Sequence, residues 1–313
     1  STDLVRWTAI FSYLHFNEHE RLSVRNLCCL FHTVLPGPTC TGVYTIFPHP
    51  KHPSLNSLMN RLNAMARVEG SNLPENLFLA NGVHVIEIYQ RYGRDCNIVE
   101  IHFPISIIGE SREHCIVRGG LLMKGKKEDD VNVSNLTLRD SKDCGVRGNC
   151  APFHLDNVSV ENSGDCGVVV SGAKILWTRS NHTGKNNGVY KRSTMKNCNV
   201  SHSARSGLFV MEGGLMTIDG NGTTIHHNCT NGNSGEYGLH AGGPAYADPQ
   251  RIPSSIHLAS SSTIETISKN NGGGGNYGGD GAIAIVQKKT IIIETIIETI
   301  QEATPEDDSE EDY

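Results

Sequence analysis

Two aspartates at equivalent positions of a short repeat are the residues of this chain best suited to chemistry. Asp143 and Asp165 each begin the tetrapeptide Asp-Cys-Gly-Val. If the two repeats are neighbours in space, the carboxylates repel each other, which raises one pKa, or they bind a hard cation such as Ca²⁺. An aspartate before a small residue and a glycine is also ordinary turn chemistry. We favour the turn, because a third repeat has Arg205 at this position, and we assign no catalytic residue.

Histidines form a second cluster of candidate ligands, at His202, His226, His227 and His240. Imidazoles are common metal ligands. However, His226 and His227 are adjacent, and adjacent side chains of a strand point to opposite faces. We therefore expect a structural or surface role for this cluster.

The cysteines are expected to remain thiols. The chain has ten cysteines and shows no export signal, which favours a reducing compartment. Cys144 and Cys166 have the spacing of neighbours, so a disulfide between them is the alternative. Cys28, Cys29 and His32 lack the paired spacing of a zinc site. No metal and no other cofactor is expected.

A repeat organises the middle of the chain. "NLTLRDSKDCGV" (Asn135–Val146) is followed after 22 residues by "NVSVENSGDCGV" (Asn157–Val168), and later by "NCNVSHSARSGL" (Asn197–Leu208). The last offset is 40 residues, which leaves room for two copies. We interpret the intervening "WTRSNHTGKNNGV" as a degenerate copy. A period this short holds strands and turns, not helix pairs.

The pattern inside each copy predicts stacked coils. Leu136 and Leu138, like Val158 and Val160, alternate with polar residues as in a strand with one buried face. A single coil cannot bury that face, so the coils stack at about 4.8 Å. Stacking predicts a ladder of the leading asparagines, which are Asn135, Asn157 and Asn197. It also predicts a column of glycines that form a turn, which are Gly145, Gly167 and Gly207.

Composition and charge exclude some classes of protein. The net charge is −6, but seven of the 33 acidic residues lie in 302–313, so the remainder has 26 acids against 27 bases. A neutral body gives no electrostatic case for nucleic acid. No stretch is apolar enough to span a membrane, and the N-terminus is a poor signal peptide. We expect a cytoplasmic or nuclear protein with no membrane association.

These features resemble the right-handed parallel β-helix proteins of the pectate-lyase-like superfamily. The segment Pro53–Gly70 places Leu58, Leu62 and Met65 on one helical face, similar to the helix that closes the open end in that superfamily. The segment "ISIIGES" (Ile105–Ser111) resembles one of its first coils. The resemblance implies a mainly β fold, a right-handed parallel β-helix (solenoid) with a small N-terminal helical module.

The same resemblance sets the expected domain boundaries. Residues 37–80 are a Pro-rich linker and capping helix, 81–288 are the β-helix, and 289–313 are a C-terminal capping segment and acidic tail. Polysaccharide lyases of this fold hold Ca²⁺ with clustered acids beside a basic residue that abstracts a proton. The architecture also serves hydrolases, adhesins and binding modules, so it does not imply one activity.

Residues 1–36 differ in kind. "IFSYLHFNEHERLSVRNLCCLFHTVL" resembles an F-box, the helical module that docks on the Skp adaptor of cullin ubiquitin ligases. The resemblance implies that an apolar set docks on this adaptor: Ile10, Phe11, Leu14, Leu22, Leu27, Cys28 and Phe31. The alternative is a helical hairpin that only caps the solenoid.

Two insertions offer candidate binding residues. Tyr237, Tyr246 and Arg251 lie in or beside segments that interrupt the coils, and Tyr and Arg often form binding hot spots. We therefore expect a non-enzymatic recognition protein that binds a protein partner, as the substrate receptor of an SCF-type ubiquitin ligase. The alternatives are a carbohydrate-binding β-helix and, less favoured, a polysaccharide lyase or hydrolase.

Overall fold

The computed structural model describes residues 44–124, 129–172, 192–219, 222–243, 254–259 and 262–286. The predicted adaptor-docking residues Ile10 to Phe31 lie outside these ranges, and so do Tyr246 and Arg251. Within the described ranges, no helix has the length and apolar character needed to cross a membrane.

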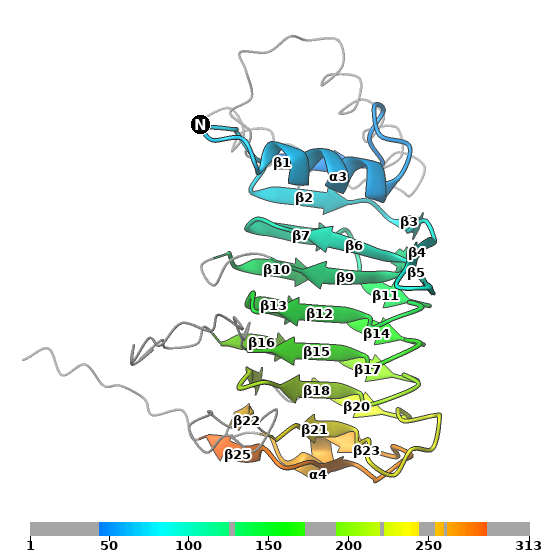
Figure 1. Cartoon of the computed structure of the whole chain (residues 1–313), viewed down its shortest axis with the longest axis vertical. Coiled ribbons are helices and arrows are strands. Elements are labelled where there is room, and N and C mark those ends of the chain that lie inside the picture. Colours follow the sequence, from blue (N-terminus) through cyan, green and yellow to red (C-terminus); the bar gives the residue numbers. More distant parts are fainter. Residues whose placement is uncertain are drawn as a thin grey trace, which may run out of the picture.

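The described residues form a parallel β-helix with three long sheets (Figure 1). Sheet 1 runs in the order β1 (Tyr44–Phe47), β2 (Asn76–Leu79), β7 (Ile105–Gly109), β10 (Val131–Ser134), β13 (Phe153–Asp156), β16 (Ser193–Lys196), β19 (Leu215–Asp219), β22 (Ser255–Ala259) and β25 (Ala282–Val286). Its neighbouring strands are all parallel, which confirms the predicted mainly β solenoid.

The other two sheets complete each coil. Sheet 2 contains β3 (Gly82–Val85), β8 (Cys115–Arg118), β11 (Thr137–Arg139), β14 (Ser159–Glu161), β17 (Asn199–Ser201), β20 (Thr224–His226) and β23 (Ser268–Lys269). Sheet 3 contains β6 (Ile98–Ile101), β9 (Gly120–Met123), β12 (Val146–Asn149), β15 (Val168–Ser171), β18 (Leu208–Met211), β21 (Leu239–Ala241) and β24 (Tyr277–Gly278).

Left-handed residues turn the chain from one sheet to the next. Asn135 follows β10 with a φ of 54°, and Asp140 follows β11 with a φ of 58°. Asn and Asp enter this region more readily than other residues with a side chain. Asn157, the equivalent residue of the next coil, has a φ of 55°, and its Nδ2 donates to Asn135 Oδ1 at 2.9 Å. The predicted asparagine ladder is confirmed for these two coils.

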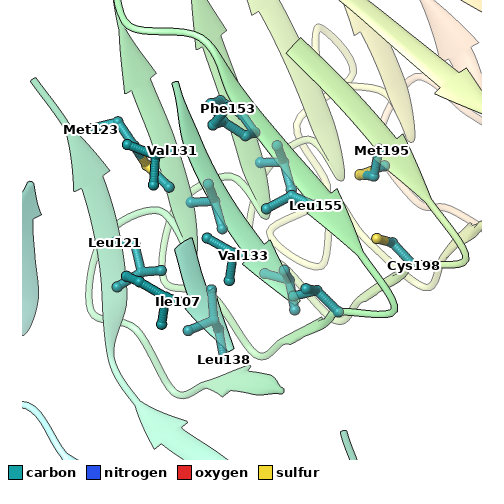
Figure 2. Packing of buried hydrophobic residues seen from close by; sticks show 14 of the residues in the cluster. Ile107, Leu121, Met123, Val131, Val133, Leu138, Phe153, Leu155, Met195 and Cys198 are labelled. Atoms are coloured by element: carbon teal, nitrogen blue, oxygen red, sulfur yellow. The ribbon is translucent and has the colours of Figure 1, made fainter. Parts of the chain in front are cut away.

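The inward side chains stack in rows that form one continuous core. Ile107, Val133 and Leu155 are in register across β7, β10 and β13, and each is at most 3% exposed. Figure 2 shows them facing side chains of the other sheets, including Leu138. Truncating a fully buried leucine such as Leu155 to alanine is expected to cost about 2–5 kcal/mol.

The prediction that "WTRSNHTGKNNGV" forms a degenerate coil of its own is wrong. Ser159 pairs with Asn199, and Val168 pairs with Leu208, so the strands on either side of the 40-residue offset are direct neighbours. Because adjacent strands lie only about 4.8 Å apart, no further coil fits between them. The segment 177–189 lies outside the described residues.

Glycine is required in the column of Gly145 for a reason other than the predicted turn. Gly145 is not among the residues with positive φ. A Cβ built on it would lie 2.3 Å from Val160 Cγ1 and 2.9 Å from the Gly167 carbonyl oxygen. Close approach of the next coil therefore excludes a side chain here.

The N-terminal end of the stack is closed by α3 (Leu55–Met65) (Figure 1). Ser54 caps this helix by accepting from the Ser57 amide at 3.2 Å. Leu58 and Leu62 are buried in the core, and Met65 packs against it. Since β1 and β2 already pair in sheet 1, that sheet begins before residue 81.

Candidate functional site

A β-hairpin interrupts the first coils. β4 (Tyr89–Arg91) and β5 (Arg94–Cys96) are antiparallel and stand at one side of the stack (Figure 1). Their two-residue turn, Tyr92–Gly93, has φ values of 51° and 74°, as in the turns that best match strand twist. Tyr92 is 94% exposed, and the guanidinium carbon of Arg91 lies 5.5 Å from its ring centroid. The hairpin tip therefore presents an aromatic ring to solvent, above the half-buried guanidinium of Arg91.

A groove of about 830 Å³ lies between this hairpin and the turns that lead into sheet 3. The hairpin contributes Arg91, Tyr92, Arg94 and Asp95. Successive coils contribute Lys142 and Asp143, then Asp165, then Arg205, and outward residues of sheet 3, including Arg147, complete the lining. The predicted stacking of Asp143 above Asp165 is confirmed, because the Asp165 amide donates to the Asp143 carbonyl at 3.2 Å.

The aspartate column continues as a ladder of alternating charge. Arg205 Nη1 lies 3.3 Å from Asp165 Oδ1, and Arg205 Nε lies 2.7 Å from Glu236 Oε1. The Glu236 side chain is only 10% exposed, and no described group donates to its Oε2. Arg205 therefore supplies most of the compensation for a nearly buried carboxylate.

Asp143 and Asp165 are engaged by local groups. Asp143 Oδ1 accepts from the Cys144 amide at 2.8 Å, which is the predicted turn interaction. The carboxylates and the Cys144 sulfur lie within 4.8 Å of one another. Burial raises the pKa of the Cys144 thiol well above its ordinary value, and the thiolate that a metal requires is therefore disfavoured.

Arg205 is poorly suited to proton abstraction. Asp165 raises the pKa of Arg205, with a smaller contribution in the same direction from Glu236. Its guanidinium therefore holds its proton more firmly than a free one, and a general base must release it. Burial also raises the pKa of Cys166, so neither thiol of this column is activated as a nucleophile.

Three cations of the groove have no ionic partner among the described residues: Arg94, Lys142 and Arg147. They come from the hairpin and from the turn and strand of one coil. Arg94 and Lys142 are exposed, and Arg147 is half-buried. The lining also holds three acids, Asp95, Asp143 and Asp165, against five cations, so cations are in excess by two. An excess of one charge in a concave surface attracts a ligand of the opposite sign. The groove is therefore suited to an anionic ligand.

Tyr237, a predicted binding residue, lies in the column of Cys144 and Cys166. Its half-buried ring packs where a Cβ on Gly274 or Gly278 would stand, 2.4 Å from Tyr237 Cε1 in each case. It also contacts His240, with centroids 5.3 Å apart. The ring is thus partly used for packing, and its role in binding stays a prediction.

The hairpin and Glu236 were absent from the residues singled out by sequence. "GEYGL" aligns with "KDCGV" once the glycines are matched, so the repeat places Glu236 at the position of Asp143. "YQRYGRDC" has polar residues around a Tyr-Gly turn, which is a weak hairpin signal. Nothing in the local sequence brings this hairpin to Asp143, because that neighbourhood depends on the winding of the coils.

No protein-family model matches the chain, and no curated protein matches it by sequence. By its fold and its groove, the protein is a parallel β-helix with a groove beside a hairpin, in which cations are in excess. The likeness to pectate-lyase-like proteins and to an F-box rests on the residues quoted above.

Proposed function

We propose that this protein is a non-enzymatic recognition protein whose groove binds an acidic, extended segment of a target protein. The observation that carries the proposal is the set of unpaired cations, Arg94, Lys142 and Arg147, in one concave surface. The exposed ring of Tyr92 and the half-buried guanidinium of Arg91 at its rim add the residue types that dominate binding energy in protein interfaces.

The dimensions of the groove support an extended ligand. Its lining follows turns of consecutive coils, from Lys142 through Gly164 and Ala204 to Asn231. Three steps between four coils span about 14 Å, the length of about four residues of extended chain. A segment with two or three acidic side chains would match the unpaired cations in number.

A carbohydrate ligand is the second candidate, favoured by one observation. Tyr92 is an almost fully exposed aromatic ring beside a cationic groove. An anionic polysaccharide offers carboxylates for the arginines and a sugar face for the ring. It competes for the same site, so one experiment can separate the two ligands.

The experiment measures fluorescence anisotropy of two probes, a labelled glutamate-rich peptide and a labelled oligogalacturonate, with the full chain. We expect peptide binding that weakens with salt, because exposed charges are screened. Arg94→Glu with Arg147→Glu should weaken it at least about tenfold. Arg61→Glu, on the exposed face of α3 and outside the groove, is the control for charge reversal elsewhere, at half the change in net charge.

The outcomes separate the candidates. Binding of the oligogalacturonate alone, lost in the double variant, would replace the protein ligand with a carbohydrate. Equal binding of either probe by the double variant and by Arg61→Glu would overturn the groove as the site. Loss in both variants would show a non-specific charge effect and would also overturn it.

We also propose that residues 1–36 dock on a Skp-type adaptor, so that a bound target is delivered to a ubiquitin ligase. The support is the apolar pattern of the F-box-like segment, including Phe11, Leu14 and Phe31. Pull-down of a purified Skp adaptor by the full chain tests it. Capture should be lost in Phe11→Ala with Leu14→Ala, and failure of the unaltered chain to capture the adaptor would favour the capping role.

A further inference from the structure

Three histidine rings that do not line the groove meet at the edge of sheet 2. His202 and His227 are the residues after β17 and β20, at equivalent positions of consecutive coils, with φ values of 57° and 54°. Their rings are stacked, with centroids 5.4 Å apart and planes 5° apart. His226, the last residue of β20, places its ring 5.0 Å from that of His227 and 6.2 Å from that of His202.

This arrangement corrects the expectation that His226 and His227 point to opposite faces. Opposite faces require two successive residues in extended conformation. His227 is left-handed instead, so its side chain returns to the side of His226. As a result, the two Nδ1 atoms lie 2.7 Å apart.

A chain of hydrogen bonds behind the rings assigns the tautomer of His226. The Glu161 carboxylate accepts from Ser159 Oγ at 2.7 Å, and Asn199 Nδ2 then donates to Ser159 Oγ at 3.1 Å. Asn199 therefore turns its Oδ1 toward His226 Nε2, at 2.8 Å. Because this oxygen only accepts, Nε2 carries a hydrogen, and a neutral His226 has its lone pair on Nδ1.

We propose that His226 and His227 bind a divalent transition-metal cation that favours imidazole, such as Ni²⁺ or Cu²⁺, while His202 stacks on the ring of His227 and does not bind the metal. The metal stands to one side of the line between the two Nδ1 atoms, so both rings turn until their lone pairs point to it. The hydrogen on Nδ1 of His227 moves through solvent to Nε2 of the same ring, so that the imidazole stays neutral. Asn199 holds His226 through Nε2–H, as outer groups commonly hold a metal-ligating histidine.

The spacing of the two nitrogens favours some metals over others. With metal–nitrogen bonds of about 2.0–2.1 Å, a separation of 2.7 Å corresponds to an angle of about 80–85° at the ion. This value is nearer to the right angles of tetragonal Cu²⁺ or Ni²⁺ than to the tetrahedral angles of Zn²⁺. Ni²⁺ and Cu²⁺ are therefore the metals with which we test the site.

Neighbouring charges act on the site. Burial lowers the pKa of His226, and His227, His202 and Lys269 lower it further, in that order. Lys269 stands opposite His226 in the sheet and repels any cation at the site. Removing this lysine should tighten metal binding.

The column itself supplies conservative variants for the test. Asn162 and Asn270 occupy the positions of His202 and His227 on the flanking coils, with the same left-handed φ of 54°. His227→Asn and His202→Asn therefore remove an imidazole while they keep a residue that this turn accepts. His114→Asn removes an exposed histidine of another coil and is the control.

The experiment titrates the untagged full chain with Ni²⁺ alone by calorimetry, and records Cu²⁺ electron paramagnetic resonance. His227→Asn should lower Ni²⁺ affinity at least about tenfold and remove the nitrogen coupling of one of the two imidazoles from the Cu²⁺ spectrum. His114→Asn should leave both unchanged, and Lys269→Gln should raise the affinity. Thermal unfolding of each variant checks the fold.

Two results would overturn the site. One is the same Ni²⁺ affinity and the same Cu²⁺ spectrum for His227→Asn and the unaltered chain. The other is an equal loss in His114→Asn and His227→Asn, which would mean scattered binding to surface histidines. Neither result depends on the ligand of the groove, since the proposed function does not use these rings.

Discussion

Arg205 Nε lies 2.7 Å from the nearly buried carboxylate of Glu236. Removing the arginine leaves that carboxylate without its main partner, so Arg205→Met should lower the free energy of unfolding by about 1–3 kcal/mol. Urea unfolding measures the change. The double variant Arg205→Met with Glu236→Gln should recover most of it, because the buried charge is then gone. An equal loss in the double variant would contradict the pairing.

The contact between coils at Gly145 predicts a steric effect. Gly145→Ala should destabilise the protein by about 1–3 kcal/mol, because the new Cβ would overlap Val160 and the next coil. Gly235→Ala is the matched control, since the nearest atom to its Cβ is Asn233 Oδ1 at 3.6 Å. Thermal unfolding should separate the two variants clearly. Similar melting temperatures would show that the coils are not packed as described.

Glu100 predicts a dependence of stability on acid. Burial opposes the charged form, but hydrogen bonds and charge from Lys124, with help from His102 and Arg91, lower the pKa of Glu100 below its ordinary value. A lowered folded pKa stabilises the protein above the unfolded pKa of about 4.5. This stabilisation is lost as the pH falls through the folded pKa. In Glu100→Gln, urea unfolding should show a smaller loss between pH 6 and pH 3. An unchanged loss would contradict the assignment.

The groove predicts no lyase activity. Asp165 is paired with Arg205, whose pKa is raised, so the basic residue of this column is poorly suited to abstract a proton. We expect no release of unsaturated products from pectate, with or without Ca²⁺, as followed by ultraviolet absorbance. A rise in absorbance that Asp143→Ala or Asp165→Ala abolishes would replace the recognition function with catalysis.

The repeat of residues 135–168 was sufficient to predict stacked coils. Its alternation gives one buried face per strand, and matching asparagines and aspartates recur at one offset. Neighbouring coils touch along their whole length, so local pattern and tertiary contact coincide. This is why the pairing of Asp143 with Asp165 was also correct.

The sequence pattern alone predicts wrongly where the spacing between repeats does not determine the backbone conformation. The offset of 40 residues was interpreted as two coils, whereas the pairing of Val168 with Leu208 shows one step. An insertion and a degenerate coil have the same length, and only the sheet distinguishes them. In the same way, the φ of His227 depends on the turn in which the coil places it, not on its being a histidine.

The sequence by itself determined the β-helix, because the buried apolar residues and the stacked asparagines recur in it at a fixed period. Only the tertiary structure decided which charged groups meet. The hairpin of Arg91 and Arg94 reaches the turns of Asp143, Asp165 and Arg205 across separations of about 50 to 110 residues. Such contacts depend on how far each coil rises and where a hairpin leaves it, and no local pattern encodes either quantity.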